Sequence, residues 1–576
     1  MKKVSATLVI FILTVAASWS LFRPAFFRIH DYVHAARIAE MSRALEDGQF
    51  PVRWSEHFGY GYGMPLFEFY APLPYYVGAL GYWLGIEVVA IIKLLFILAS
   101  LGTALGAFAL GKKLFGNTGA ILTATALTLA PYRAVNLFVR GALSEAWGMM
   151  AMPWILLGVV KVAHREKDGW LMLTLSLVVL MLSHNIMTML FVPFVLLFGA
   201  LYVGYRKWVV QRSDYSQLQV FHHLITAFLV AGGLAAFYLI PALVEKDFTQ
   251  VSQIFGGYFH YSQHFLYLRQ FLQVNWGYTG SVWGPEDGIS FFLGWGQWLG
   301  LGSALFLLTV RLIQLMRKHG LKKLGKILTD NKLIAGLIFG LLFVAGLFMT
   351  LFRSKVLWDA LPALAYAQFP WRFMGVGVLF LSLLIGFSVT LIKNKRLRYL
   401  VTIGLFLIML QNSTFFKPAE YLANNDDYYY TDADRIEREM SSILPDYIPS
   451  QMSTELTAPT VQAWCEPDCA ESVELLVKKS DQMLVKTNFA QDQTLQLAIA
   501  DYPGWRIELD GQTVSKFSTE MGNLAISVPA GEHLVGARLT STPIRLIADL
   551  ISLSSWLLLI YLSFFRPPAL DKIKNK

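Results

Sequence analysis

Charged residues are scarce in this chain: Asp, Glu, Lys and Arg make up 15% of its 576 residues, whereas hydrophobic residues make up 55%. Soluble globular proteins carry roughly 25% charged residues, because a compact domain needs polar surface toward water. The scarcity therefore excludes a soluble protein and indicates an integral membrane protein. Aromatic residues, at 14%, are suited to the two membrane–water interfaces.

Cysteine is also scarce, since the chain contains only Cys465 and Cys469. Their short spacing is compatible with a small disulfide loop in an oxidising compartment or with two free thiols. Neither a second Cys pair nor a His pair completes a four-ligand set, which argues against a zinc site. We therefore expect no structural metal at these two cysteines.

The net charge of +9 raises the question of a nucleic-acid partner. However, the Lys and Arg residues gather beside apolar segments, as the positive-inside rule describes, and do not form a separate basic patch. We therefore expect the membrane lipid to be a partner and nucleic acid not to be one.

Hydropathy predicts an all-α polytopic membrane protein with about 12 transmembrane helices, each of roughly 20 apolar residues. The predicted spans are residues 4–22, 87–111, 117–131, 143–162, 169–183, 186–204, 221–241, 291–310, 333–352, 373–392, 398–414 and 546–565. The first span follows Met1-Lys2-Lys3 like a signal peptide. It lacks a convincing Ala-x-Ala cleavage site, so we expect it to remain as an uncleaved span.

Basic clusters recur on one side of this topology, which supports the spans. With the N-terminus inside, the cytoplasmic segments are 112–113, 161–167, 206–212, 311–332, 393–398 and 566–576. The sequence thus predicts a multi-pass protein of the cell inner (plasma) membrane with both termini in the cytoplasm.

Three regions follow from this topology. Residues 1–414 form a multi-span membrane domain whose first extracytoplasmic loop covers 23–86. Residues 415–545 are polar and rich in alternating runs, which predict an extracytoplasmic β-sandwich with a hairpin turn at Asp510-Gly511. Residues 546–576 form the last transmembrane helix and a basic cytoplasmic tail.

The first extracytoplasmic loop contains His30 and Asp31, followed by an amphipathic helix through Ala44 and then by Arg53 and Glu68. A carboxylate just outside the first span is where a general base could meet a substrate at the membrane surface. Alternatively, Asp31 caps the helix that follows it, because negative charge is favourable at a helix N-terminus.

Further charges lie near the outer ends of other spans, against the topological bias. Arg133, Arg140 and Glu145 lie close together in the sequence, His184 lies between two spans, and Arg372 opens the tenth span. Arginine provides a planar fork of donors that matches phosphate, so an anionic ligand would explain the positive residues. Interfacial snorkelling or ion pairing, for instance of Arg140 with Glu145, would explain Arg372 and Arg140 equally well and is the favoured explanation for Arg133.

Three stretches resemble membrane proteins filed as "6-pyruvoyl-tetrahydropterin synthase-related", within the GT-C superfamily of membrane glycosyltransferases. They are His30-Asp31 with Gly48–Trp54, Arg140 with Glu145, and Phe369–Phe373. Tyr502–Trp505, Asp510-Gly511 and Val528–His533 resemble the C-terminal domain of teichoic-acid-glycosylating membrane proteins. The soluble pterin synthase needs a three-histidine zinc site, which this sequence does not contain.

The resemblance implies a GT-C-like fold and inverting transfer of a sugar from a polyprenyl-phosphate donor to a lipid-linked or cell-envelope glycan acceptor. It makes Asp31 the candidate base, with His30 beside it. The candidate ligands of the donor phosphate are Arg372, Arg140 and Arg53, supported by Glu145, His184 and Glu68. No cofactor is certain. The acidic position is a single Asp and not a pair, which leaves a divalent metal possible.

Two other functions remain open at this point. One is a transporter or flippase of lipid-linked glycans, although internal pseudo-symmetry and paired broken helices are not evident in the sequence. The other is a non-catalytic glycan-assembly membrane protein.

Overall fold

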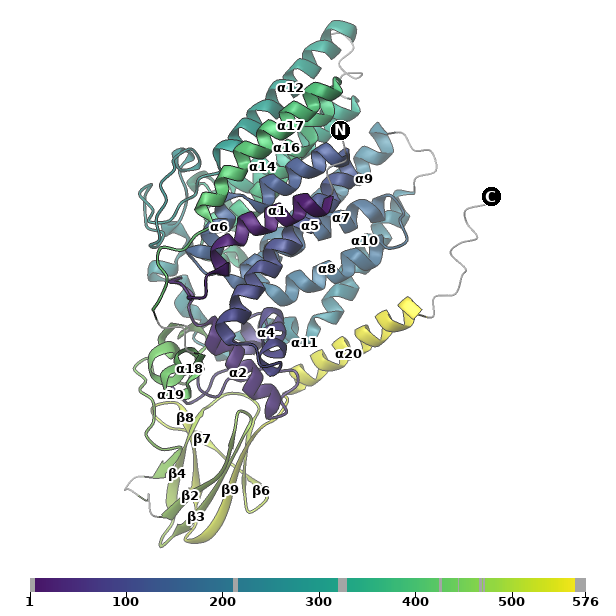
Figure 1. Ribbon diagram of the computed structural model, residues 1–576. Helices are drawn as coiled ribbons and strands as arrows, with labels where there is room; N and C mark the ends of the chain where they lie inside the picture. Colours follow the sequence, from purple (N-terminus) through teal and green to yellow (C-terminus); the bar gives the residue numbers. More distant parts are fainter. Residues whose placement is uncertain are drawn as a thin grey trace. The chain divides into compact units, whose positions relative to one another are not determined.

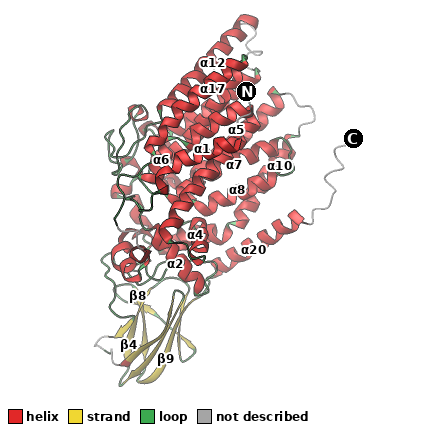
Figure 2. Ribbon diagram, viewed as in Figure 1, coloured by secondary structure: helices red, strands yellow, loops and turns green. Residues whose placement is uncertain are grey.

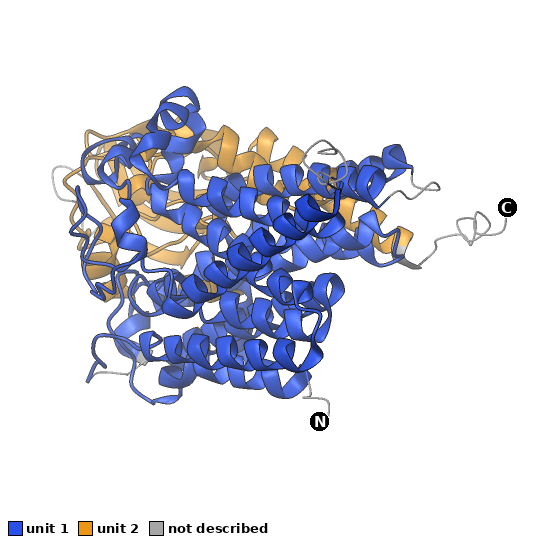
Figure 3. Cartoon of the chain, turned by 90° about the horizontal axis from the view of Figure 1, so that it is seen from above, with its two compact units in different colours: residues 1–39, 72–227, 252–432 blue, residues 40–71, 228–251, 433–576 orange. Residues whose placement is uncertain are grey.

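The computed structural model describes residues 6–210, 216–319, 329–423, 427–443, 445–465, 469 and 472–564. Met1-Lys2-Lys3, the predicted tail 566–576 and parts of the predicted cytoplasmic segments 206–212 and 311–332 lie outside the described residues. The chain divides into two compact units (Figure 3). Unit 1 comprises residues 1–39, 72–227 and 252–432, and unit 2 comprises 40–71, 228–251 and 433–576.

Helices dominate the structure, as Figures 1 and 2 show. Among the described residues, 8 helices are long and apolar enough to cross a membrane, which confirms the expected membrane protein. They are α5 (Val88–Thr128), α7 (Leu143–Ala163), α9 with its extension (Asn185–Val209), α10 (Gln217–Leu234), α12 (Trp295–His319), α14 (Asn331–Phe348), α16 with its flanking turns (Pro370–Leu391) and α20 (Pro543–Phe564). Shorter apolar helices cover Ala6–Phe22 (α1 and the turn after it) and Gly169–Ser183 (α8).

Helix α5 contains two of the predicted spans. Its backbone leaves the helical conformation at Gly116, where φ is +76°. A Cβ atom on Gly111 would lie 2.9 Å from the Cα of Ala120, whereas nine residues of straight helix extend about 13.5 Å. The chain therefore folds back at Gly116. The separation predicted between spans 87–111 and 117–131 corresponds to this break.

The total of about 12 spans stays a prediction. Helix α17 (Lys395–Leu410), at the predicted span 398–414, has 16 residues and is not among the 8 long apolar helices.

Helix α16 (Met374–Ser388) is buried along its whole length, in keeping with a helix that is hydrophobic on all sides. It packs against α5, α12 and α14 and forms the centre of unit 1.

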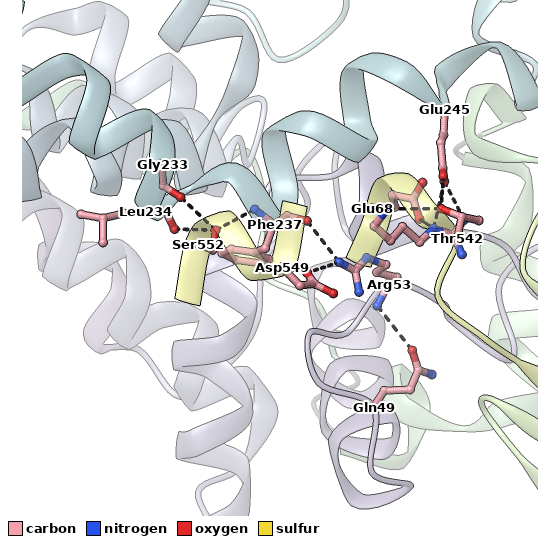
Figure 4. A network of polar contacts seen from close by, with 11 residues as sticks. Gln49, Arg53, Glu68, Gly233, Leu234, Phe237, Glu245, Thr542, Asp549 and Ser552 are labelled. Atoms are coloured by element: carbon pink, nitrogen blue, oxygen red, sulfur yellow. Dashed lines mark hydrogen bonds and ion pairs between the residues drawn. The ribbon is translucent and has the colours of Figure 1, made fainter. Parts of the chain in front are cut away.

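Unit 2 contains a helix break that the sequence did not predict. Helices α10 and α11 (Ala236–Val244) are separated at Ala235. The hydroxyl of Ser552, on α20, accepts a hydrogen bond from the Phe237 N–H at 2.8 Å and donates to the Gly233 carbonyl at 3.0 Å (Figure 4). A serine side chain thus satisfies backbone groups that the break leaves without helical partners.

The C-terminal part of unit 2 consists of two antiparallel sheets, with strand orders β1-β4-β8-β7 and β2-β3-β9-β5-β6. The strands are β1 (Ala463–Cys465), β2 (Val473–Lys479), β3 (Gln482–Phe489), β4 (Gln493–Ala500), β5 (Trp505–Leu509), β6 (Gln512–Val514), β7 (Phe517–Ser518), β8 (Asn523–Val528) and β9 (Gly531–Leu539). A two-residue turn, Asp510-Gly511, joins β5 to β6, and both residues have positive φ. The predicted β structure and its hairpin turn are therefore confirmed.

Cys465 and Cys469 are joined by a disulfide in the structure.

The first extracytoplasmic loop predicted at 23–86 is shared between the units, because residues 40–71 belong to unit 2. In this loop lie α2 (His34–Glu46) and α3 (Leu66–Phe69), with α4 (Leu73–Trp83) at its end.

Candidate active site

The segment that carries His30 and Asp31 lies against the segment between α6 (Pro131–Phe138) and α7 in unit 1. The His30 N–H donates to the Val139 carbonyl at 3.1 Å, and the Asp31 N–H donates to the Arg140 carbonyl at 3.0 Å. These two backbone bonds bring together two of the sequence motifs, although they are far apart in the chain.

The Asp31 carboxylate is held by an arginine of the following helix. Its Oδ2 accepts a hydrogen bond from Arg37 Nη1 at 2.9 Å. The Arg37 side chain is fully buried, whereas the Asp31 side chain is 25% exposed. Because a guanidinium remains protonated in proteins, this pairing favours the ionised carboxylate. Asp31 therefore presents an oriented carboxylate that follows the first apolar helix in the chain, with its Oδ1 buried and its side chain partly exposed.

A second set of hydrogen bonds, between uncharged groups, holds the same segment in place. His34 Nε2 lies 2.5 Å from the Gly141 carbonyl oxygen, which can only accept, so Nε2 carries the proton. His34 Nδ1 then accepts from the Tyr75 hydroxyl at 2.9 Å. Burial lowers the pKa of His34, against the attraction of Asp31, and burial raises the pKa of Tyr75. Both groups are therefore neutral at pH 7 and act as positioning contacts.

Glu145, in the first turn of α7, is the centre of a buried polar cluster. It accepts hydrogen bonds from the Tyr132 hydroxyl at 2.8 Å, from Asn136 Nδ2 at 3.1 Å and from Arg140 Nη1 at 2.7 Å. Arg140 also donates to Asn136 Oδ1 at 2.6 Å. The ion pair of Arg140 with Glu145, which the sequence left as one of two explanations, is thus present.

Arg372 approaches the same carboxylate from the 3₁₀ turn Pro370–Phe373, which directly precedes α16. Its Nε lies 3.6 Å from Glu145 Oε2. The Arg372 guanidinium lies 5.1 Å from the Phe369 ring centroid, and the Arg140 guanidinium lies 4.6 Å from the Trp371 ring centroid. These two rings stack on each other at 4.8 Å. The two arginines are therefore held over an aromatic surface, and we call Tyr132, Asn136, Arg140, Glu145 and Arg372 the Glu145 cluster.

The Glu145 cluster contains two guanidinium groups and one carboxylate, so it has one surplus positive charge. Its carboxylate is fully buried, while the Arg140 and Arg372 side chains are 12% and 10% exposed. Fixed donors in a partly dry site interact strongly with an anion. The arrangement is suited to binding a phosphate group on the exposed side of the arginines.

His184, between α8 and α9, belongs to the surroundings of this cluster. Its Nδ1 accepts from the Met187 N–H at 2.9 Å and caps α9. Burial and the charges of Arg372 and Arg140 outweigh the attraction of Glu145 and lower the pKa of His184 to about 3. His184 is therefore neutral, with its proton on Nε2. His30, by contrast, is exposed, and its Nε2 lies 3.0 Å from the Tyr278 carbonyl.

Arg53 and Glu68 belong to unit 2, where each has an ion partner on α20. Figure 4 shows the pair of Arg53 with Asp549. Arg53 Nη2 donates to Asp549 Oδ1 at 2.6 Å. Glu68 Oε2 lies 3.0 Å from Arg545 Nε, and Arg545 Nη2 lies 2.8 Å from Glu245 Oε2. The phosphate-binding and supporting roles inferred for Arg53 and Glu68 remain predictions.

The residues around Arg545 form a second buried cluster. The Tyr502 hydroxyl donates to Glu68 Oε1 at 3.0 Å, and the Thr542 hydroxyl donates to Glu245 at 2.5 Å. Burial raises the pKa of Glu68 to about 8, against the attraction of Arg545, and a hydrogen bond to Glu245 favours the protonated form. Glu68 is thus mainly protonated at pH 7. We call Glu68, Glu245, Tyr502, Thr542 and Arg545 the Arg545 cluster.

Sequence reasoning missed several contributors to unit 1, among them Arg37 and Tyr75. Arg37 was detectable as a charge on the apolar face of an amphipathic helix, whereas Tyr75 lies in an aromatic-rich segment with no distinguishing pattern. Arg133 is fully buried and donates from Nη1 to the Thr128 carbonyl at 3.1 Å, and burial lowers its pKa to about 10. This bond is to the Thr128 backbone and not to Glu145, so Arg133 is left outside the cluster.

In the part of the chain that the structure describes, no group of three or more His, Cys, Asp and Glu side chains could hold a metal ion. Whether the reaction uses a divalent metal, which the sequence left open, therefore stays open.

No protein-family model and no curated protein matches this sequence. Among solved structures, the chain is similar to the arabinofuranosyltransferase AftD from Mycobacteria, with 15% identity, a TM-score of 0.45, and coverage of 74% of this chain and 28% of that one. It is also similar to the Archaeoglobus fulgidus oligosaccharyltransferase tethered to an acceptor peptide, with 12% identity, a TM-score of 0.42, and coverage of 80% and 61%. The chain thus spans about a quarter of AftD and three-fifths of the oligosaccharyltransferase. With TM-scores below 0.5, the functional argument rests on the residues of the site.

Proposed function

We propose that this protein is a membrane glycosyltransferase that transfers a sugar from a polyprenyl-phosphate donor to a hydroxyl of an extracytoplasmic glycan acceptor. The observation that carries the proposal is the backbone pairing of Asp31 with Arg140. It joins a partly exposed carboxylate to a cluster with surplus positive charge. A base for the acceptor and a site for the leaving phosphate are the two groups that this reaction requires.

In the proposed reaction, the acceptor oxygen attacks the anomeric carbon of the donor sugar and Asp31 takes the hydroxyl proton. The bond between the anomeric carbon and the phosphate oxygen breaks, and its electron pair leaves with the phosphate. Arg140 and Arg372 stabilise the charge that develops on that oxygen. A single displacement of this kind inverts the anomeric configuration.

Arg37 has a defined part in this scheme, because its guanidinium holds one oxygen of Asp31 at 2.9 Å. The carboxylate remains ionised and oriented, which a base needs before it can take a proton. His34 and Tyr75, as neutral neighbours, keep this pair in place without adding charge.

The transfer requires that the cluster faces the extracytoplasmic side, as the distribution of basic residues predicts. Single Cys substitutions at Glu420 and Lys167, both exposed positions of unit 1, test this orientation. An impermeant thiol reagent applied to intact cells should label a cysteine at 420 and not one at 167. Labelling at 167 would contradict the proposed topology.

A flippase of lipid-linked glycans is the second candidate, and the break between α10 and α11 favours it, since transporters use discontinuous helices at their binding sites. At this break, however, Ser552 satisfies backbone groups on both sides. Because its backbone groups are hydrogen-bonded within the protein, this break is suited to stable helix packing. We therefore prefer the glycosyltransferase to the flippase.

The proposal is tested by Asp31→Asn, which keeps the shape of the side chain and removes its basic oxygen. Transfer from short-chain prenyl-phosphate hexoses and pentoses should fall about 100-fold or more, while binding of farnesyl phosphate is retained. Asp359→Asn, at an exposed aspartate of unit 1 that pairs with Lys355, is the matched control. If Asp31 only caps α2, Asp31→Asn should transfer at the wild-type rate, because Asn caps about as well as Asp.

A further inference from the structure

Gln368, at the start of the motif that contains Arg372, has an unusual backbone. Its φ is +58° and its ψ is −46°. The Phe369 N–H donates to the Ala367 carbonyl at 2.5 Å, which closes a three-residue γ-turn centred on Gln368. A γ-turn with positive φ is rare and strained for a residue with a side chain. Glycine would adopt this conformation readily, so the presence of glutamine requires a reason.

The glutamine side chain has a defined orientation. Arg372 Nη1 donates to the Ala367 carbonyl at 2.7 Å and lies 3.5 Å from Gln368 Oε1. Because a guanidinium can only donate, the amide oxygen must face Arg372 and the amide N–H₂ must face away from it. No acceptor in the described chain lies within hydrogen-bond distance of this N–H₂ group, and Gln368 is half-buried.

The γ-turn also fixes the aromatic surface beneath the two arginines. Phe369, which directly follows Gln368, stacks on Trp371 and lies under the Arg372 guanidinium. Gln368 therefore carries a neutral donor group on the turn that also holds Phe369 and Arg372, with the amide N–H₂ on the side away from the Arg372 guanidinium. It adds hydrogen-bonding capacity to the site without adding charge.

This neutral character matches the charge of the donor. A lipid phosphodiester carries one negative charge, which the surplus positive charge of the Glu145 cluster already balances. The departing monoester carries more negative charge and gains from an additional hydrogen bond. A third cation would instead bind the departing phosphate more tightly and slow its release.

We propose that Gln368 is a binding residue whose amide N–H₂ donates to a phosphate oxygen of the donor, and that the strained γ-turn is retained because it presents this amide. The inference rests on the proposed function, since it assigns a further ligand to the same phosphate. The strained backbone at Gln368 then lowers the stability of the fold but serves the binding of the donor.

The test uses Gln368→Met and Gln368→Gly in the full-length protein in nanodiscs, with farnesyl phosphate as the probe. Met keeps the length and the strained backbone but removes the amide, whereas Gly removes the amide and relieves the backbone. Both variants should bind farnesyl phosphate about tenfold more weakly than the wild type. The melting temperature should be unchanged in Gln368→Met and raised by about 1 °C or more in Gln368→Gly.

The matched control is Gln273→Met, at an exposed glutamine of unit 1, which should bind as the wild type does. Wild-type affinity in Gln368→Met or Gln368→Gly would overturn this inference and leave the proposed function standing. Absence of farnesyl phosphate binding in both the wild type and Gln273→Met would overturn the proposed function, and the role of Gln368 with it. The two failures are therefore distinguishable.

Discussion

The two buried clusters of this protein have opposite composition. The Glu145 cluster in unit 1 combines two arginines with one carboxylate, whereas the Arg545 cluster in unit 2 combines one arginine with two carboxyl groups. The arginines of the first are 12% and 10% exposed, while the arginine and both carboxyl side chains of the second are at most 4% exposed. Under the proposed function, the first cluster receives the donor phosphate, whereas the fully buried second cluster is a structural contact.

This difference shows how a membrane protein distinguishes a binding site from a structural contact. In the Arg545 cluster a proton on Glu68 removes the excess negative charge, so no external ligand is needed. In the Glu145 cluster the excess is positive, and arginine does not lose its proton at ordinary pH. In the proposed function the donor phosphate balances that excess, which is why we assign the substrate to unit 1.

The largest expected effect comes from replacing the central carboxylate of each cluster by an amide. Glu145→Gln leaves two arginines without a counter-charge and should destabilise the protein by about 3–5 kcal/mol. Glu68→Gln resembles the protonated form that is already present and should cost less than about 1 kcal/mol at pH 7. Denaturant titrations in mixed micelles measure both. Equal losses in the two variants would remove the distinction between the clusters.

The pH dependence of unfolding sharpens the same comparison. The pKa of Glu68 is raised from 4.5 to about 8, so the folded state holds a proton that the unfolded state releases above about pH 4.5. Stability from this group is fully present below that pH and is lost as the pH rises through about 8. The slope should not exceed about 1.4 kcal/mol per pH unit, and Glu68→Gln should remove it. The lowered pKa of Glu245 acts in the opposite direction, below this window.

A smaller effect is expected from Arg372→Lys, which keeps the charge of the Glu145 cluster but loses the planar fork. Affinity for farnesyl phosphate should fall about tenfold, because a lysine ammonium cannot donate in the same bidentate manner. Isothermal titration in nanodiscs provides the measurement. Arg269→Lys, at a half-exposed arginine that pairs with Glu286, is the control and should bind normally. A uniform loss in both variants would contradict a specific role for the planar fork of Arg372 in holding the phosphate.

The sequence was most informative where a residue departed from its surroundings. Asp31, Arg140, Glu145 and Arg372 were noticed because each is a charge near the predicted outer end of an apolar segment. The structure gathers all four into unit 1. Arg53 and Glu68 were noticed for the same reason, but their ion partners lie on α20. A charge in the sequence does not by itself identify its partner.

Other features had no local sequence signal. The γ-turn at Gln368 places a glutamine where glycine would be expected from the backbone, so composition could not reveal it. The break between α10 and α11 depends on Ser552, a residue far along the chain that satisfies the exposed backbone. Strands β6 and β7, with 3 and 2 residues, are too short for an alternating pattern to be recognised.

The most direct test of the account is to locate the phosphate of a bound prenyl phosphate by cryo-electron microscopy of the protein in nanodiscs. The account predicts phosphate density within hydrogen-bond distance of both Arg140 and Arg372, on the side away from Glu145 and within reach of the Asp31 segment. Phosphate density at Arg53 or Arg545 of unit 2, with none at the two arginines of unit 1, would contradict it.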